Sequence, residues 1–145
     1  MPQIKVMIVD DSASARQVFS RLLSEDPGIE VMATAVDPFD AARKMRDALP
    51  DVILLDLELP RMDGLTFLSK IMQQHPVPVV ICSSHSESGS RAAMRALEIG
   101  AAEVIGKPRV ATREERQEAG MLLTDAVRAA AQAKRTRMTR KEGAA

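Results

Sequence analysis

The chain has 145 residues, 46% of them hydrophobic and 28% charged, with one cysteine and a formal net charge of zero. That length suffices for one domain with a substantial core, and no apolar run approaches the roughly 20 residues of a membrane span. With no signal-peptide pattern at its start and a lone Cys82 that excludes an internal disulfide framework, we expect a cytoplasmic protein with no membrane insertion.

Aliphatic runs alternate with amphipathic stretches from the start of the chain. In chain order, the first part predicts a strand at 4–9, a helix at 13–26, a strand at 30–36 and a helix from Pro38 to Leu49. The first helix is indicated by Val18, Phe19 and Leu22, which recur at helical spacing. The second is indicated by Asp37, which can cap its N-terminus, and by the proline that suits its first turn.

The same alternation continues through the second part of the chain. It predicts a strand at 51–57, a helix between Gly64 and Pro76, a strand at 77–84, a helix at 88–100, a strand at 101–106 and a helix at 112–134. Gly100 is placed to cap the end of its helix. Thr112 and Glu115 have the spacing of a capping box at the start of the last helix.

Strands that alternate with helices imply right-handed crossovers and a parallel sheet. The strand runs are apolar at successive positions, which indicates burial on both faces. We therefore expect an α/β fold: a five-stranded parallel doubly wound sheet, flavodoxin-like with order 2-1-3-4-5, and helices on both faces. This domain covers residues 1–133, and the working site lies at the carboxyl ends of the strands.

Residues 134–145, KRTRMTRKEGAA, form a basic end. Charge is unevenly distributed along the chain. Residues 1–106 hold ten basic and fifteen acidic side chains, whereas residues 107–145 hold ten and five. Such a tail can bind nucleic acid or serve as a solvated linker. It carries no aromatic side chains that could stack on bases, so we expect a basic linker or tail and no nucleic acid partner.

Polar side chains lie at the carboxyl ends of four of the predicted strands: Asp10 and Asp11, Asp56, Ser83 and Ser84, and Lys107. Three neighbouring carboxylates repel one another when ionised. A hard divalent cation with oxygen ligands removes that repulsion, and Mg²⁺ suits such a site. One carboxylate can act as a nucleophile toward phosphorus, while the lysine and a serine hydroxyl hold phosphoryl oxygens. The constellation predicts a pocket that accepts a phosphoryl group.

Four motifs in order carry a resemblance to a known family. They are VDDS after the first strand, DLELPRMDG after the third, a serine near the end of the fourth and KP after the fifth. At these positions the sequence resembles the receiver domain of two-component response regulators, over about residues 3–130. The resemblance implies a domain that takes its phosphoryl group from a histidine kinase. Such a domain also promotes its own phosphorylation and dephosphorylation.

The same resemblance implies roles for individual residues. Asp56 is the phosphoacceptor. The Mg²⁺ ligands are Asp10, Asp11, Asp56 and the main-chain carbonyl of Glu58. Ser83 follows the phosphate and Lys107 bridges to it. The resemblance also implies a cis peptide bond before Pro108, although X–Pro bonds are usually trans. One departure is Val104, which stands where many receivers carry a Tyr or Phe that reorients on activation, so readout by a rotating ring is in doubt.

A narrower similarity concerns residues 77–108. The SS pair, the RALEIGA helix end and Glu58 in LELPRMDG resemble the N-terminal receiver of chemotaxis protein-glutamate methylesterases. In that family a linker joins the receiver to a hydrolase domain, which the unphosphorylated receiver blocks. The resemblance implies that this chain regulates a C-terminal methylesterase domain that the given sequence does not include.

Other functions stay open at this stage. A standalone receiver would act by binding a downstream protein when it is phosphorylated. A fragment of a transcription regulator is less favoured, because no helix-turn-helix pattern follows residue 130. A flavodoxin-like cofactor binder is disfavoured because three acids would repel a flavin phosphate. His85 beside Ser84 suggests a hydrolytic pair, but no G-x-S-x-G elbow is present. Cys82 in an apolar run is expected to be a small core residue.

Overall fold

The structure is a computed structural model that describes residues 2–58, 63–83 and 91–143. Its strands are β1 (Ile4–Val9), β2 (Ile29–Ala35), β3 (Val52–Leu55), β4 (Val79–Ser83) and β5 (Glu103–Gly106). Its helices are α1 (Ala13–Ser24), α2 (Pro38–Asp47), α3 (Gly64–Gln74), α4 (Arg91–Ile99) and α5 (Arg113–Gly143). The alternation of strands and helices predicted from the sequence is confirmed.

The strands form one parallel sheet in the order β2-β1-β3-β4-β5. The expected flavodoxin-like order is therefore confirmed. Two features make the sheet parallel: each strand is followed by a helix that carries the chain back, and strands apolar at successive positions can be buried on both faces.

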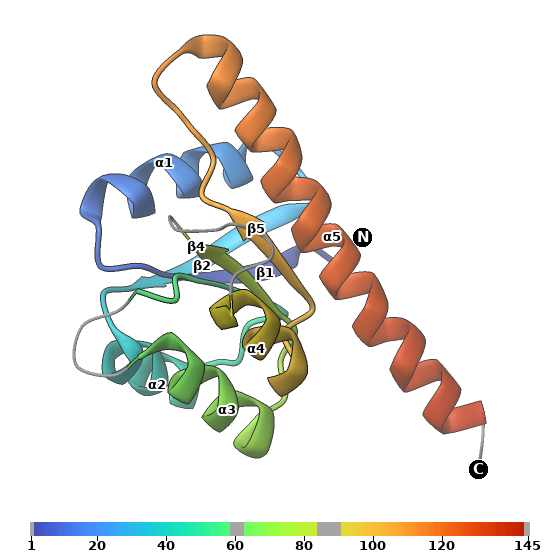
Figure 1. Ribbon diagram of the computed structural model, residues 1–145. Coiled ribbons are helices and arrows are strands. Elements are labelled where there is room, and N and C mark those ends of the chain that lie inside the picture. Colours follow the sequence, from blue (N-terminus) through green and yellow to red (C-terminus); the bar gives the residue numbers. More distant parts are fainter. Residues whose placement is uncertain (1, 59–62, 84–90, 144–145) are drawn as a thin grey trace.

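Helices cover both faces of the sheet and enclose two separate cores. α1 and α5 lie on one face, and α2, α3 and α4 lie on the other (Figure 1). Strand β1 divides its side chains between them, because successive residues of a strand point to opposite faces. Val6 and Ile8 pack with Leu23 of α1 and Leu123 of α5. Met7 belongs to the other core, which includes side chains of α2, α3 and α4.

The predicted helix caps are present. The backbone N–H of Asp40 donates to the Asp37 carboxylate at 2.8 Å, at the start of α2. Thr112 and Glu115 bond reciprocally, side chain to backbone N–H, at 3.0 Å in each direction, which is a capping box. Gly100 has φ +134° just after α4, a conformation that glycine adopts without strain.

Several element boundaries differ from those predicted. β3 ends at Leu55 and β4 at Ser83; the predicted last residue of the fourth strand, Ser84, lies outside the described residues. The expected start of the α4 helix, at residues 88–90, lies outside the described residues. The last helix continues past Lys134 to Gly143, where a linker or frayed end was expected. Among the described residues, no helix combines the length and apolar character of a membrane span.

Candidate functional site

Strands β1 and β3 end side by side, and an aspartate follows each. Val9 pairs with Leu55, and the backbone N–H of Asp56 donates to the Val9 carbonyl at 3.0 Å. The two side chains are almost fully buried, with 2% of Asp10 and 4% of Asp56 exposed. Parallel pairing in this register therefore places both carboxylates at the same edge of the sheet.

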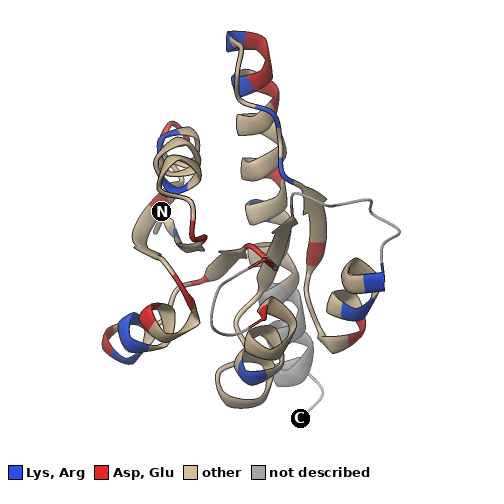
Figure 2. Ribbon diagram, turned by 60° about the vertical axis from the view of Figure 1, so that its left-hand side comes forward, with Lys and Arg blue, Asp and Glu red and all other residues tan. Residues whose placement is uncertain are grey.

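A third carboxylate completes an acidic cluster. Carboxylate oxygens of Asp10, Asp11 and Asp56 lie within 4.8 Å of one another, and Asp11 is the exposed member. Such an arrangement of oxygen atoms fits a hard divalent cation, which binds carboxylates together with water. Figure 2 shows acidic residues in the segments that follow β1 and β3, and basic residues in the segment that follows β5. The donor set fits the Mg²⁺ that the sequence predicted.

Lys107 enters this cluster from the end of β5. Its Nζ atom lies 3.0 Å from Asp10 Oδ2 and 3.3 Å from Asp56 Oδ2. The backbone N–H of Lys107 also donates to the carbonyl of Ser83, at 3.0 Å, which fixes where the lysine leaves the sheet. The buried charge of Asp56 thus has a cationic partner, which is what a carboxylate among aliphatic side chains requires.

The pKa values of this pair follow from burial and from each other's charge. Burial raises the pKa of the Asp56 carboxyl above its ordinary value, and the charge of Asp10 acts in the same direction; the Glu58 N–H and Lys107 oppose the increase. Burial alone would lower the pKa of Lys107, but its bonds and charge interactions with the two aspartates outweigh it and raise that pKa. Lys107 is therefore firmly cationic at neutral pH.

The loop between β1 and α1 holds Asp10 in place through neighbours that sequence reasoning missed. The Ser12 N–H donates to Asp10 Oδ1 at 2.9 Å, and the Ser12 hydroxyl caps α1 by accepting from the Ala15 N–H at 3.2 Å. The Arg16 guanidinium donates to the main-chain carbonyl of Asp10 at 2.7 Å. Of these contacts, only the helix cap could have been predicted from the sequence, because serine is a preferred N-cap residue.

The turn after β3 holds Asp56 in a similar way. The backbone N–H of Glu58 donates to Asp56 Oδ1 at 3.0 Å. Gly64 opens α3, and its N–H donates to the Leu57 carbonyl at 3.1 Å. A Cβ atom at this glycine would lie 2.6 Å from the Leu57 Cα, so the close approach of two backbone segments requires glycine here. The role of the Glu58 carbonyl as a metal ligand stays a prediction.

Ser83 and Val104 lie where the sequence placed them. Ser83 ends β4, is 7% exposed and pairs with Gly106 of β5. Val104 lies on β5, pairs with Ile81 and packs against the core under α2, α3 and α4. Ser84, His85 and the rest of the loop over residues 84–90 lie outside the described residues.

One implied feature is wrong, and one expectation about the core is confirmed. The peptide bond before Pro108 is trans, since the described chain contains no cis peptide bond; trans is the ordinary form of an X–Pro bond. Cys82 is buried in the core between the sheet and α1 and α5. Burial raises the pKa of its thiol to about 12, so it is a core residue and an unreactive one.

The sequence matches one family model and many relatives. Residues 6–117 match the model described as response regulator receiver domain. A protein-glutamate methylesterase/protein-glutamine glutaminase of Geobacter metallireducens is 55% identical over 99% of this chain and 40% of its own length. A Cereibacter sphaeroides protein of the same name, from a group 3 operon, is 59% identical over 94% of this chain and 37% of its own. The chain thus spans about two fifths of these relatives.

Solved structures agree with the sequence matches. The response regulator domain of Thermotoga maritima CheB has a TM-score of 0.81 and 32% identity, covering 90% of this chain and 97% of that one. A chain in the complex of the P1 domain of CheA3 with CheY6 from R. sphaeroides has a TM-score of 0.71 and 33% identity, covering 87% and 98%. Both similarities extend over nearly the whole of each solved chain.

Proposed function

Because the chain belongs to the response regulator receiver domain family, we propose that it is a phosphorylation switch whose phosphoacceptor is Asp56. The observation that carries this proposal is the contact of Lys107 with both buried aspartates, at 3.0 and 3.3 Å. An ordinary structural ion pair needs one acid. Here one cation serves two acids, and a third lies within 4.8 Å at the exposed side.

In the proposed reaction, a carboxylate oxygen of Asp56 attacks the phosphorus of a phosphohistidine on a histidine kinase. A bond forms between that oxygen and phosphorus, the bond between phosphorus and the histidine nitrogen breaks, and an aspartyl phosphate results. Lys107 donates to an oxygen of the transferred group, and the Ser83 hydroxyl donates to another. The reaction needs the ionised carboxylate, which Lys107 and the Glu58 N–H favour.

The residues that would hold Mg²⁺ are Asp10, Asp11, Asp56 and the Glu58 main-chain carbonyl. When bound, the ion neutralises charge on the phosphoryl oxygens during transfer. The buried Asp10 is fixed by Ser12 and Arg16, so its carboxylate is already oriented. Asp11 is exposed and reaches the cluster from the solvent side, through which a phosphodonor must approach.

The relatives support a proposal for the partner and for the output domain. The relatives named above are methylesterases that this chain matches over 37–40% of their length. We propose that the receiver regulates a C-terminal protein-glutamate methylesterase domain in the same cytoplasmic protein, in chemotaxis adaptation. A chain similar to this one occurs in a complex with a CheA3 P1 domain, which supports a kinase of that type as phosphodonor.

Labelling with acetyl phosphate tests the phosphoacceptor. The wild-type chain should be labelled once per molecule in Mg²⁺ and not after chelation. Asp56→Asn should abolish labelling, because an amide is a poor nucleophile. Asp47→Asn, which changes an exposed acid at the end of α2, should be labelled like the wild type. Stoichiometric labelling that survives in Asp56→Asn would show that the nucleophile is another residue.

The methylesterase assignment is tested separately. The coding sequence should be read onward from codon 145. A continuous frame long enough for a further domain, on the order of 150–200 residues, with a serine hydrolase nucleophile motif would support it. A different effector domain, or none, would contradict the methylesterase assignment and leave the phosphoacceptor unaffected.

A further inference from the structure

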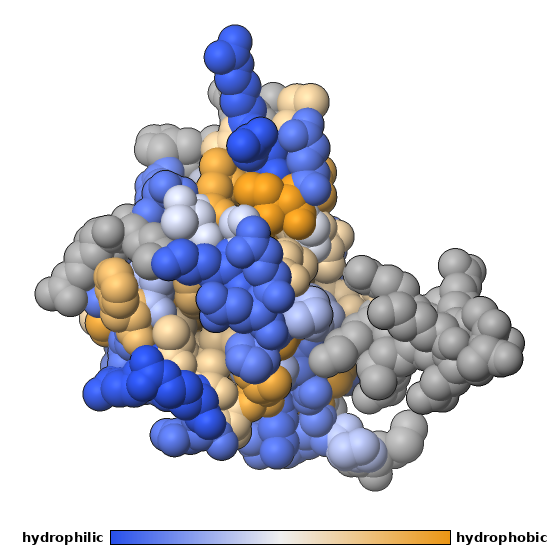
Figure 3. Space-filling view, turned by 90° about the horizontal axis from the view of Figure 1, so that it is seen from below, coloured by the Kyte–Doolittle hydropathy of each residue, from blue (hydrophilic) through white to orange (hydrophobic). Residues whose placement is uncertain are grey.

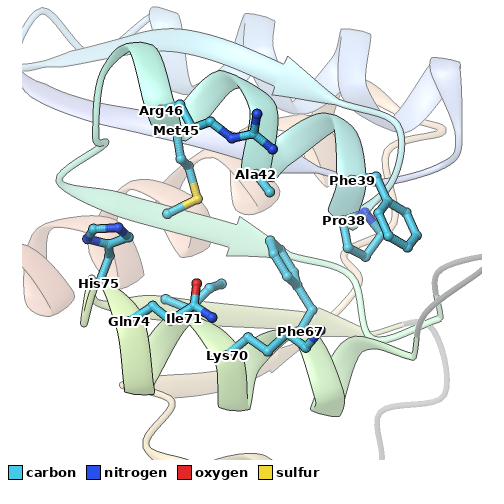
Figure 4. Close-up of a pocket in the computed structure, with 10 residues that line it drawn as sticks. All are labelled: Pro38, Phe39, Ala42, Met45, Arg46, Phe67, Lys70, Ile71, Gln74 and His75. Atoms are coloured by element: carbon cyan, nitrogen blue, oxygen red, sulfur yellow. The ribbon is translucent and has the colours of Figure 1, made fainter.

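A groove separates α2 from α3, away from the acidic cluster. It has a volume of about 380 Å³. Its floor is apolar, since Phe67 and Ile71 of α3 line it and are only 5% and 4% exposed. Figure 4 shows Met45 of α2 and Phe67 of α3 pointing into the gap from opposite sides. The volume falls within the range of about 300–1,000 Å³ that is typical of small-molecule sites.

One small residue of α2 lines the groove opposite α3. The residues of α3 that line it, Phe67, Lys70, Ile71 and Gln74, recur at one-face helical spacing. Opposite them α2 presents Ala42, which is exposed and has only a methyl group. A larger side chain at this position would fill the space between the helices, and the alanine leaves it open.

Aromatic and basic side chains border the groove. Pro38 and Phe39 line the end near the start of α2, where Phe39 is 54% exposed. Figure 4 shows His75 at the opposite end and the Arg46 side chain running along α2 toward Ala42. Lys70 contributes a further ammonium from α3. No carboxylate is among the residues that line the groove, so cationic side chains border its apolar floor.

Two cations of the groove, Arg46 and Lys70, differ in their ion pairing from two other cations of α2. Arg43 and Lys44 both form ion pairs with Asp40. Within the part of the chain that the structure describes, Arg46 and Lys70 have no carboxylate partner among the ion pairs. Seen from the side of α2, α3 and α4, hydrophobic areas of the surface lie between hydrophilic side chains (Figure 3).

We propose that this groove binds a small amphipathic carboxylate. Its apolar body lies on Phe67 and Ile71, and its carboxylate is held by Arg46 of α2, with Lys70 of α3 adding positive charge from the other helix. Burial of the apolar body supplies the affinity, and the two cations select an anion over a neutral molecule of the same shape. None of these residues belongs to the phosphoacceptor site, so the two sites can be tested independently.

Decanoate and decanol form a matched pair of probes, with the same chain and different head groups. Each is titrated into the ¹⁵N-labelled protein while amide shifts are followed. Decanoate should shift amides of α2 and α3 and bind about fivefold or more tighter than decanol, as expected of a partly exposed ion pair. Equal binding of the two probes, no binding of either, or shifts confined to other elements would each overturn the proposal.

Variants separate the head-group contacts from the cavity. Arg46→Gln with Lys70→Gln should weaken decanoate about fivefold or more and leave decanol unchanged. Arg43→Gln, which removes an ion-paired cation outside the groove, should change neither. Ala42→Leu should fill the groove and abolish binding of both probes. Labelling by acetyl phosphate should persist in every variant, which would show that each variant is folded. Undiminished binding of decanoate to Ala42→Leu would contradict the proposed site.

Discussion

The ammonium nitrogen of Lys107 lies 3.0 Å from Asp10 Oδ2, and this contact joins the ends of two strands that are not neighbours. Asp10 follows β1 and Lys107 follows β5, and β3 and β4 lie between those strands in the sheet. The lysine spans this distance because its stem is long and its backbone is tied to Ser83 of β4. Because Lys107 contacts both Asp10 and Asp56, a change at either aspartate reaches β5 directly.

Replacement of this lysine should separate metal binding from the conformational response. In Lys107→Ala, Mg²⁺ should bind at least as tightly as in the wild type, because a competing cation has gone. A phosphoryl analogue should no longer shift amides of β4 and β5. Both effects are measured by amide spectra during Mg²⁺ and beryllofluoride titration. Lys70→Ala, which removes an exposed lysine from α3, is the control; an unchanged response in Lys107→Ala would contradict the role of Lys107.

Arg16 should set the affinity for the metal without touching it. Its guanidinium donates to the Asp10 carbonyl at 2.7 Å, so Arg16→Met frees the loop that carries two acidic ligands. We expect a Kd for Mg²⁺ several-fold higher and a loss of roughly 1 kcal/mol of folding stability. Arg16→Lys should restore part of the Mg²⁺ affinity and part of the stability. Arg21→Met, which replaces an exposed arginine on the same helix, should change neither quantity. Wild-type Mg²⁺ affinity in Arg16→Met would exclude this positioning role.

Two glycines should respond in opposite directions to the same substitution. In Gly64→Ala the new Cβ meets the Leu57 backbone at 2.6 Å, so the turn beside Asp56 must shift at a cost of about 1–3 kcal/mol. In Gly120→Ala the nearest atom is Leu22 Cδ2 at 3.7 Å, and alanine in a helix should stabilise by roughly 0.5–1 kcal/mol. Urea unfolding measures both. A Gly64→Ala variant as stable as the wild type would show that the turn has room.

The link between Asp26 and α5 should make stability depend on pH. Arg128 donates to both carboxylate oxygens, at 2.9 and 2.6 Å, and together with the Gly28 N–H it lowers the pKa of Asp26. A folded pKa below the unfolded value of about 3.9 stabilises at neutral pH, and this contribution is lost as pH falls through the folded pKa.

The matched variant for this pair is Asp26→Asn. Its urea midpoint should lie below that of the wild type at pH 7, and the difference should shrink near pH 3. Glu30→Gln, an exposed acid on β2, serves as the control and should show no such difference. If the urea midpoints of wild type and Asp26→Asn differed by the same amount at both pH values, ionisation of Asp26 would not be the source of the stability difference.

Cys82 should be protected from modification in the folded protein. Its thiol is buried and has a pKa of about 12, so the reactive thiolate is scarce and inaccessible at neutral pH. Iodoacetamide should label it in urea and leave it almost unlabelled in buffer, as measured by mass spectrometry. Rapid labelling of the native chain would show that β4 opens readily.

Much of the fold and the main site residues could be predicted from local patterns. The aliphatic runs mark the strands because each is buried on both faces. The order of the motifs places Asp10, Asp56 and Lys107 at one edge because carboxyl ends of parallel strands share an edge. Arg16 was missed because its contact depends on the path of the β1–α1 loop. The contact of Gly64 with Leu57 was missed because it depends on the turn after β3.

The extent of α5 could not be predicted because two properties of residues 134–143 conflict. Their dense positive charge indicated a solvated linker, since like charges repel along a chain. Yet Lys, Arg, Met and Glu are all good helix formers, and the helix has already been started by the capping box at Thr112. Once nucleated, a helix extends at little cost per residue, and α5 continues to Gly143.

Helix α5 extends well beyond the last of its buried side chains. α5 has 31 residues and is therefore about 46 Å long. Its buried side chains, from Ala119 to Ala131, pack against the sheet and α1, and the remaining turns project beyond the sheet (Figure 1). The backbone hydrogen bonds of a helix are formed within the helix itself, which makes it stiff. A small tilt of the packed part of α5 would therefore displace its far end by a larger distance.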